Sequence, residues 1–512
     1  MLLTIVISFS FLIVVVQMEP NVDSSYVAAV YEHTVIQTDD PRIPVSRSDA
    51  LRNMQKNLDI YEVQAAKATK QGVQILVFPE DGIQGFNFSR LSIFNYLETI
   101  PDPQEESWNP CTEPGKYNNT EVLQRLSCMA RHYNLYLVAN MADLQPCPLK
   151  TDPSSSCPPD GHWQFNTNVV FSSDGLLVAR YHKQNLYFEE SFDKPPQPEI
   201  ITFDTPFAGR FGLITCFDIL FYKPTIELVE KGVHQLIYPT GWLNSLPLLD
   251  SVQFQSAFSL GAKVTLLAAN LRKENVPLTH GYKTMTGSGI YTPYSATYHH
   301  AQKGDPEEGM LLVARVPVLD PLWAGQSVDT EEGLVGGMMV VTLKHDGTTA
   351  WLSEMLKMSV RISVSSAAQS FEPGMLSEGE VNVCNGTFCC KLQYRRIQQG
   401  DSKELYALGA FSGKHHGMYF IQVCALLRCA GLDPSSCGQK VQEAESKFDF
   451  VLEGRFGSRY VYPSVLASKF VLEQPKQLET APDGTVTMTH SNMTDGLVTA
   501  CLYGRMYHLD NE

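Results

Sequence analysis

The sequence predicts an α/β fold followed by a smaller β-rich domain, and three observations support this prediction. Short apolar runs alternate with longer amphipathic stretches through about the first 270 residues, which is the pattern of strands and helices packed in layers. Clusters of Gly, Pro, Asn and Asp separate these segments, as turns require. After about Lys303 the composition changes, because Gly, Pro and acidic residues are frequent at 304–309 and 329–337. Short alternating runs such as 359–365 and 484–489 then indicate strands.

The expected elements of the first part alternate between strand and helix. Strands are expected at 26–31, 74–78, 135–139, 168–171, 176–181, 211–215, 235–238 and 265–269, and helices at 47–69, 120–133, after Pro224 and at about 250–262. In the long helix, Leu51, Met54 and Leu58 lie on one stripe, and Ser46 can cap the first turn. The turn signal at 172–175 (SSDG) joins two of the strands into a hairpin.

Three of these strands end in side chains that form a coherent chemical set. Cys216 follows the run 211–215, Glu80 follows 74–78, and Lys183 lies at the far end of the hairpin. Each has an ordinary interpretation when taken alone, as a buried or disulfide-bonded cysteine or as a solvated charge. Together they supply what an enzyme needs to attack an amide with sulfur.

A specific role is expected for each of the three residues. Cys216 would be the nucleophile, and Glu80 would take the thiol proton and later activate water, provided that burial makes the carboxylate basic enough. Lys183 would favour the thiolate and hold the developing oxyanion, with the backbone N–H of Phe217 as a second donor. A Cys–His pair with His182 is the competing arrangement, but neighbouring strand residues point to opposite faces, so Lys183 and His182 cannot both face the site.

The segments around these residues resemble the nitrilase superfamily of carbon–nitrogen hydrolases. Its pattern is Glu in FPEDG, Lys in YHKQN and Cys in TCFD, which match Glu80, Lys183 and Cys216 position by position. Other segments resemble the secreted vanin and biotinidase branch along nearly the whole chain. They include AAVYEH from Ala28, RYHKQNLYFE from Arg180, TCFDILF from Thr215, MTGSGIYTP from Met285 and ELYALGAF from Glu404.

The resemblance implies a fold and a division into domains. The fold would be a nitrilase-like four-layer α-β-β-α sandwich, in which two sheets are flanked by helices, followed by a smaller β-rich domain. The corresponding parts are a signal peptide at 1–19, a carbon–nitrogen hydrolase domain at 22–303, a connector with edge elements at 304–357 and a vanin-type C-terminal domain at 358–512.

The resemblance also implies a reaction on a small molecule. Segments such as VFPEDGIQGFNFSR from Val77 and GLVTACLYGRMY from Gly496 are more similar to biotinidases than to vanins, so release of biotin from biocytin and biotinyl peptides is expected. Hydrolysis of pantetheine is the alternative, and a secreted glycoprotein that has lost catalysis is a third. Two departures stand against the pattern: Gly241 occupies a position where Ala is expected, and 301–349 resembles neither relative.

Several features indicate secretion into the extracellular space. An apolar stretch at 2–16 precedes Glu19 and Pro20, which favours a cleaved signal over a membrane span. Of the 12 cysteines, Cys216 is expected to be free and Cys501 is the candidate for a second free thiol. Local pairs are expected between Cys111 and Cys128 and between Cys147 and Cys157, whereas the six cysteines from 384 to 437 leave fifteen connectivities open. Sequons for N-glycosylation lie at Asn87, Asn118, Asn385 and Asn492.

Other features exclude some partners and cofactors. With 512 residues, 44% apolar content and a formal net charge of −16, the chain has room for two or three domains but no surplus of basic surface for nucleic acid or an anionic membrane. The ending RMYHLDNE lacks the hydrophobic tail of a glycolipid-anchor signal, so no stable membrane anchor is expected. The adjacent histidines at 299–300 and 415–416 are interpreted as surface residues, because they lack metal-ligand spacing. The segment MTGSGI from Met285 has no phosphate-loop lysine, and no cofactor or metal is expected.

One aromatic residue is a further candidate near the substrate. Trp242 would either form a wall of the substrate cleft or pack in the core.

Overall fold

The computed structural model describes residues 25–147, 157–278, 281–302, 304–305, 308–319, 378–398, 404–415 and 417–510. The expected signal peptide and the expected strand at 359–365 lie outside these residues.

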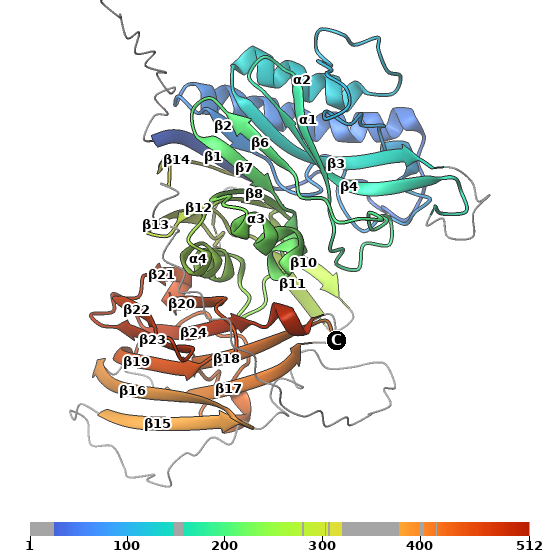
Figure 1. The fold of residues 1–512 in the computed structure, drawn as a ribbon. Helices are drawn as coiled ribbons and strands as arrows, with labels where there is room; N and C mark the ends of the chain where they lie inside the picture. Colours follow the sequence, from blue (N-terminus) through green and yellow to red (C-terminus); the bar gives the residue numbers. More distant parts are fainter. Residues whose placement is uncertain are drawn as a thin grey trace, which may run out of the picture.

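Two six-stranded mixed sheets form the first part of the chain (Figure 1). The first sheet has the strand order β14-β1-β2-β3-β4-β5 and the second has the order β13-β12-β9-β8-β7-β6. The strands of the first sheet are β1 (Ser25–His33), β2 (Ile75–Val77), β3 (Tyr136–Pro146), β4 (His162–Phe171), β5 (Leu177–His182) and β14 (Gly309–Pro317). Those of the second are β6 (Thr202–Thr205), β7 (Gly209–Leu213), β8 (Gln235–Thr240), β9 (Thr265–Asn270), β12 (Ser288–Thr292) and β13 (Ser295–His299). A separate hairpin consists of β10 (Lys273–Leu278) and β11 (Gly281–Met285).

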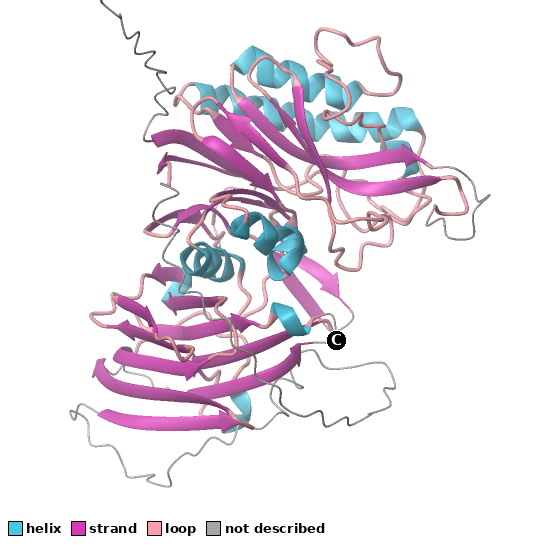
Figure 2. Cartoon of the chain, in the orientation of Figure 1, coloured by secondary structure: helices cyan, strands magenta, loops and turns pink. Residues whose placement is uncertain are grey.

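Helices cover the outer face of each sheet. Helices α1 (Arg47–Thr69) and α2 (Glu121–Tyr133) pack on the first sheet, and α3 (Glu227–Glu230) and α4 (Ser251–Ala262) pack on the second. The space between the sheets is filled by small and branched apolar side chains, including Val30, Val77, Val138, Ile237 and Leu267. The four layers therefore run α-β-β-α, which confirms the predicted fold class (Figure 2).

The C-terminal part is built from two antiparallel five-stranded sheets that enclose their own apolar core. One sheet has the order β15-β16-β19-β23-β22 and the other has the order β17-β18-β24-β20-β21. The strands are β15 (Glu378–Asn385), β16 (Phe388–Gln398), β17 (Tyr406–His415), β18 (Tyr419–Arg428), β19 (Lys447–Arg455), β20 (Val461–Ala467), β21 (Val471–Glu473), β22 (Gln477–Thr480), β23 (Thr485–His490) and β24 (Leu497–Arg505). Phe254 and Phe258 of α4 pack against Tyr462 of β20, so the outer helical layer of the first part also contacts the second (Figure 1).

Short helical turns complete the described secondary structure. They lie at Phe94–Tyr96, Cys216–Leu220, Tyr222–Ile226, Pro434–Ser436, Ser468–Phe470 and Tyr507–Leu509.

Five disulfides cross-link the described residues. The two local pairs, Cys111–Cys128 and Cys147–Cys157, are as predicted. The six C-terminal cysteines pair as Cys384–Cys389, Cys390–Cys424 and Cys429–Cys437. Cys216 and Cys501 are free and buried, as expected.

In the part of the chain that the structure describes, no helix is both long and apolar enough to cross a membrane.

Most predicted elements are present, with two instructive differences. Helix α1 has the predicted bounds, and the Ser46 hydroxyl accepts a hydrogen bond from the backbone N–H of Asp49 at 3.2 Å. Strand β3 runs seven residues beyond the predicted end at position 139, because polar side chains there are buried with partners: Asn140, for example, donates to Asn168 Oδ1 at 2.9 Å. The helix after Pro224 is short, since Gly232 follows it with a φ of +81°.

Candidate active site

Glu80, Lys183 and Cys216 follow the ends of β2, β5 and β7, and all three are buried. Their exposed fractions are 2%, 1% and 7%. The Lys183 ammonium donates a hydrogen bond to Glu80 Oε1 at 2.7 Å, and the charges of both residues act on the Cys216 thiol. The structure thus brings together the three residues that the sequence singled out.

The Glu80 carboxylate is fixed by donors on both oxygens. Oε1 accepts from Lys183 and from Asn166 Nδ2, the latter at 2.9 Å, and Oε2 accepts from the backbone N–H of Gly241 at 2.7 Å. A Cβ atom at position 241 would lie 3.4 Å from Glu80 Oε2, which is an ordinary contact. Gly241, which stands where Ala was expected, keeps the backbone N–H that donates to Glu80, and the space around it would also accept the methyl group of an Ala.

Glu189 is a further member of the cluster that the sequence did not reveal. Its carboxylate accepts from the Lys183 ammonium, from Asn166 Nδ2 at 3.0 Å and from the backbone N–H of Tyr187 at 3.1 Å. Burial alone would lower the pKa of Lys183, but the carboxylates of Glu189 and Glu80 outweigh it and hold that pKa well above its usual range. Lys183 is therefore held between two carboxylates that favour its charged form.

Cys216 has a strained backbone and a thiol whose pKa is raised. Its φ is +43°, a left-handed conformation that is costly for a side chain with a Cβ atom, and it begins the helical turn Cys216–Leu220. The carbonyl oxygen of Cys216 accepts from the Tyr238 hydroxyl at 2.9 Å. Burial, reinforced by the charge of Glu80 and opposed by Lys183, raises the pKa of the thiol well above its usual value. A base must therefore take the proton before sulfur can attack.

Asp218 holds the start of this helical turn. One carboxylate oxygen accepts from the backbone N–H of Thr215 at 3.0 Å and from the Tyr181 hydroxyl at 2.7 Å. The other accepts two hydrogen bonds from Asn185, at 2.9 and 2.8 Å. Burial raises the pKa of Asp218 to about 6, although Tyr181, Lys183 and Asn185 oppose that shift.

His182 faces away from this cluster. Its Nδ1 lies 2.8 Å from Glu199 Oε1, and its Nε2 lies 2.8 Å from Asp143 Oδ2. Both ring nitrogens are therefore engaged by carboxylates on the other side of β5, where the imidazole cannot serve Cys216.

Two aromatic residues that were expected near the substrate lie in the apolar cluster that includes Cys216. The Phe217 ring is 5.0 Å from that of Tyr187. The Trp242 ring stacks on Phe254 at 6.1 Å, and its indole N–H donates to the carbonyl of Leu249 at 3.0 Å. Trp242 thus packs in the core beside the site.

For two of the adjacent histidines, His300 and His415, the prediction of a surface position is wrong, whereas His299 is half-buried and His416 lies outside the described residues. His300 and His415 are only 9% and 8% exposed. The His300 ring stacks on Phe470 at 3.6 Å, which places it at the contact between the two parts of the chain. In the described residues, no group of three or more His, Cys, Asp or Glu is arranged to hold a metal ion.

Of the four asparagines in the N-glycosylation sequons, Asn87, Asn118 and Asn492 are exposed, and Asn385 is half-buried.

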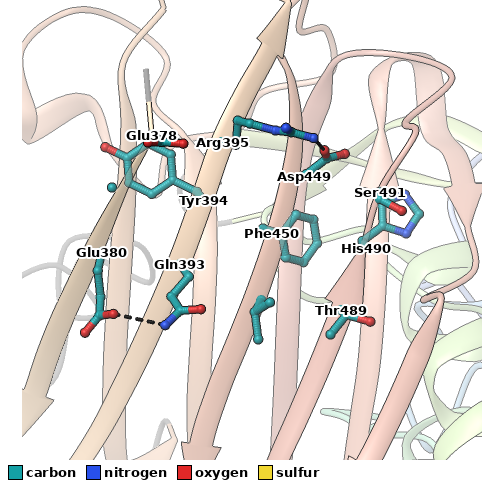
Figure 3. A pocket seen from close by; sticks show the side chains of 12 residues that line it. Glu378, Glu380, Gln393, Tyr394, Arg395, Asp449, Phe450, Thr489, His490 and Ser491 are labelled. Atoms are coloured by element: carbon teal, nitrogen blue, oxygen red, sulfur yellow. Dashed lines mark hydrogen bonds and ion pairs between the residues drawn. The ribbon is translucent and has the colours of Figure 1, made fainter. Parts of the chain in front are cut away.

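An open groove of about 520 Å³ lies away from the cluster around Cys216, on the C-terminal sheet (Figure 3). All the residues that line this groove belong to 378–491, and none belongs to the cluster around Cys216.

The fold and the buried Glu, Lys and Cys together define a carbon–nitrogen hydrolase. The carbon-nitrogen hydrolase family model matches residues 25–273, and the Vanin C-terminal domain model matches residues 364–510. The chain is 62% identical to a biotinidase from Takifugu rubripes, over 98% of each chain. It is 44% identical to a biotinidase from Bos taurus, covering 96% of this chain and 94% of that one. It is 41% identical to a pantetheinase from Sus scrofa, covering 95% and 90%. Among solved structures, an amidase from Nesterenkonia sp. is similar with a TM-score of 0.39 and 20% identity, covering 59% of this chain and 94% of that one.

The protein therefore belongs to the vanin and biotinidase family of carbon–nitrogen hydrolases.

Proposed function

We propose that this chain is a secreted amidase that releases biotin from biocytin and biotinyl peptides through a thioester at Cys216. The observation that carries the proposal is the buried Lys183 cation, held between Glu80 and Glu189 beside a buried thiol. Buried charges are costly unless they are paired, and such clusters are typical of catalytic sites. The 62% identity to a biotinidase supports the choice of substrate.

In the first half of the proposed reaction, Glu80 accepts the thiol proton as Cys216 Sγ forms a bond to the amide carbonyl carbon. The carbonyl electrons move onto oxygen, where Lys183 and the backbone N–H of Phe217 stabilise the negative charge. When the carbonyl re-forms, the C–N bond breaks. The leaving amine takes the proton back from Glu80, and the acyl group remains on sulfur as a thioester.

In the second half, Glu80 accepts a proton from water, whose oxygen attacks the thioester carbonyl. The C–S bond breaks, the carboxylic acid leaves, and Cys216 recovers its proton. Gly241 and Asn166 would hold the Glu80 carboxylate in one orientation during both steps, since each donates a hydrogen bond to it.

A pantetheine amide is the second candidate substrate, because relatives named pantetheinase are 41% identical to this chain. Both reactions cleave a linear amide, so the cluster around Cys216 fits either. The acyl group is what differs, and the contacts of the three catalytic candidates do not select it.

Hydrolysis of biocytin and pantetheine by the same purified protein, side by side, tests the proposal. We expect kcat/KM for biocytin to exceed that for pantetheine by at least about tenfold, the range a shaped pocket commonly gives. The reverse preference would assign the chain to pantetheine, and no turnover of either would favour the inactive glycoprotein.

The location of the protein is part of the proposal. Five disulfides among the described residues fit an oxidising compartment. We infer that 1–19 is a cleaved signal peptide and that Asn87, Asn118, Asn385 and Asn492 carry glycans.

A further inference from the structure

A buried arginine of the C-terminal part reaches the helical turn that begins with Cys216. Arg505, the last residue of β24, is 0% exposed. Its Nε–H donates a hydrogen bond to the carbonyl oxygen of Leu220 at 2.8 Å, across 285 residues of sequence. Leu220 is the last residue of the turn Cys216–Leu220. The guanidinium therefore satisfies a terminal carbonyl of the turn that carries the nucleophile.

The guanidinium is itself fixed on every side. Its two terminal nitrogens donate to the carboxylate of Asp510, and one of them also donates to the carbonyl of Phe420. The rings of Tyr419 and Tyr507 lie 4.5 Å from its central carbon, close enough for cation–π attraction. A planar fork held in this way has one orientation, which a flexible lysine would not reproduce.

The two ends of the turn are thus held by different parts of the chain. Asp218 holds its start through groups of the hydrolase part, and Arg505 holds its end from the C-terminal part. Tyr419 adds a second contact, because its ring lies 6.4 Å from Phe217 and 5.9 Å from Phe221. A strained residue such as Cys216, with a φ of +43°, keeps its conformation only where the surroundings fix it from several sides.

We propose that Arg505 is a positioning residue for the nucleophile, through which the C-terminal β domain becomes part of the active site. The proposal rests on the proposed function only in assigning the nucleophilic role to Cys216. It predicts that the reactivity of Cys216 depends on a residue that does not touch the thiol.

The experiment compares two variants at position 505 with a matched control. Arg505→Met removes the guanidinium, and Arg505→Lys keeps a cation without the planar fork. The control is Arg459→Met, because Arg459 also joins the two parts of the chain, through an ion pair with Glu230 of α3 at 2.6 Å. That pair is exposed on the arginine side, at 62%, and does not contact the turn Cys216–Leu220.

The rate constant for alkylation of each free thiol by iodoacetamide is measured by mass spectrometry, together with kcat and KM for biocytin. Cys501 provides an internal reporter of local unfolding, because it is buried in β24, the same strand as Arg505. Alkylation requires no knowledge of the true substrate. A failure of the proposed substrate would therefore appear only in the biocytin assay, and a failure of the positioning role would appear in the alkylation rate.

We expect Arg505→Lys and Arg505→Met to slow alkylation of Cys216 about tenfold to a hundredfold, the usual effect of a displacement of about 1 Å at a reacting atom. The same loss should appear in kcat, with Cys501 still protected and KM little changed. Arg459→Met should match the wild type in all measurements. Unchanged Cys216 reactivity in Arg505→Lys would overturn the proposal. Equal exposure of Cys501 and Cys216 in that variant would also overturn it, by showing that Arg505 only stabilises the domain.

Discussion

The cluster around Cys216 and the groove of the C-terminal sheet are both polar, but they differ in how their charges are held. At the cluster, the side chains of Glu80, Lys183 and Glu189 are 3%, 1% and 16% exposed, and each has a partner at hydrogen-bond distance. In the groove, Arg395 pairs with Asp449 across two strands, at exposures of 55% and 20% (Figure 3).

This difference distinguishes a candidate catalytic site from an ordinary protein surface. An exposed ion pair is worth about 0–1 kcal/mol, because water serves the separated charges nearly as well. Two carboxylates sharing one buried lysine pay a desolvation cost that a packed apolar core would avoid. Such an arrangement persists where the charges perform a task, which is why the more buried of the two regions is assigned the reaction.

Replacement of the nucleophile gives the largest expected effect. Cys216→Ser should lower kcat/KM for biocytin by about a thousandfold or more, because a serine hydroxyl is far less acidic than a thiol and the imidazole of His182 is engaged by Glu199 and Asp143. The melting temperature should hardly change, since the two side chains are nearly equal in size. Activity within tenfold of the wild type would remove Cys216 from the nucleophile role.

Replacement of the oxyanion donor comes next. Lys183→Met should lower kcat about a hundredfold to a thousandfold, the range for loss of one preorganised donor. The rate is expressed per molecule in which the buried Cys501 stays protected from alkylation, so that misfolded protein is not counted. Normal turnover with an unchanged melting temperature would show that Lys183 has no catalytic part. A large loss of thermal stability at normal turnover would make it a structural cation.

The third effect depends on pH. Asp218 must be ionised to accept its four hydrogen bonds, and burial raises its pKa to about 6. The logarithm of the Cys216 alkylation rate should therefore rise with a slope of about one above pH 6, from thiol ionisation, and about two below it, as both groups titrate. Asp218→Asn should lose the steeper limb, and a slope of one throughout in the wild type would contradict the capping role.

Ionisation of Asp218 should raise the alkylation rate of Cys216, but it lowers the stability of the folded chain. Its folded-state pKa of about 6 lies above the value of about 3.9 in an unfolded chain, so ionisation of Asp218 costs folding free energy. That cost is fully present above about pH 6 and is relieved as the pH falls toward about 4.

The smallest effect is expected in the groove. Arg395→Ala breaks the pair with Asp449 and should change the free energy of unfolding by no more than about 0.5 kcal/mol, with kcat and KM on biocytin unchanged. Urea denaturation and steady-state kinetics on one preparation suffice for the measurement. A clear loss of turnover would mean that the C-terminal sheet face takes part in the reaction.

Local patterns in the sequence were enough to place much of this fold. Helix α1 has the bounds that its apolar stripe and the Ser46 cap predict. Apolar runs followed by polar residues predicted that Glu80 and Cys216 follow buried strands, and the turn at 172–175 predicted that Lys183 lies at the far end of a hairpin; these residues follow β2, β7 and β5 in the structure.

The remaining features depend on contacts between distant parts of the chain. Glu189 lies next to Glu190 in the sequence, yet Glu189 bonds Lys183 whereas Glu190 forms an exposed pair with Arg42, and no local pattern separates the two. Cys384 and Cys389 pair across the neighbouring strands β15 and β16, whereas Cys390 of β16 pairs with Cys424 of β18 in the other sheet, a contact that only the packing of the two sheets creates. The bond from Arg505 to Leu220 likewise has no local signal.

The central claim is that Cys216 forms a thioester with the acyl group of the substrate. Biocytin is mixed with the enzyme, the reaction is quenched with acid within the first turnovers, and the digested protein is analysed by mass spectrometry. The account predicts that the peptide containing Cys216, and not the one containing Cys501, gains the mass of a biotinyl group, and that hydroxylamine removes it. A control with a slowly hydrolysed substrate first shows that a thioester on Cys216 survives the acid quench and the digestion. Efficient hydrolysis of biocytin with no biotinyl adduct on Cys216 under those conditions would contradict the claim.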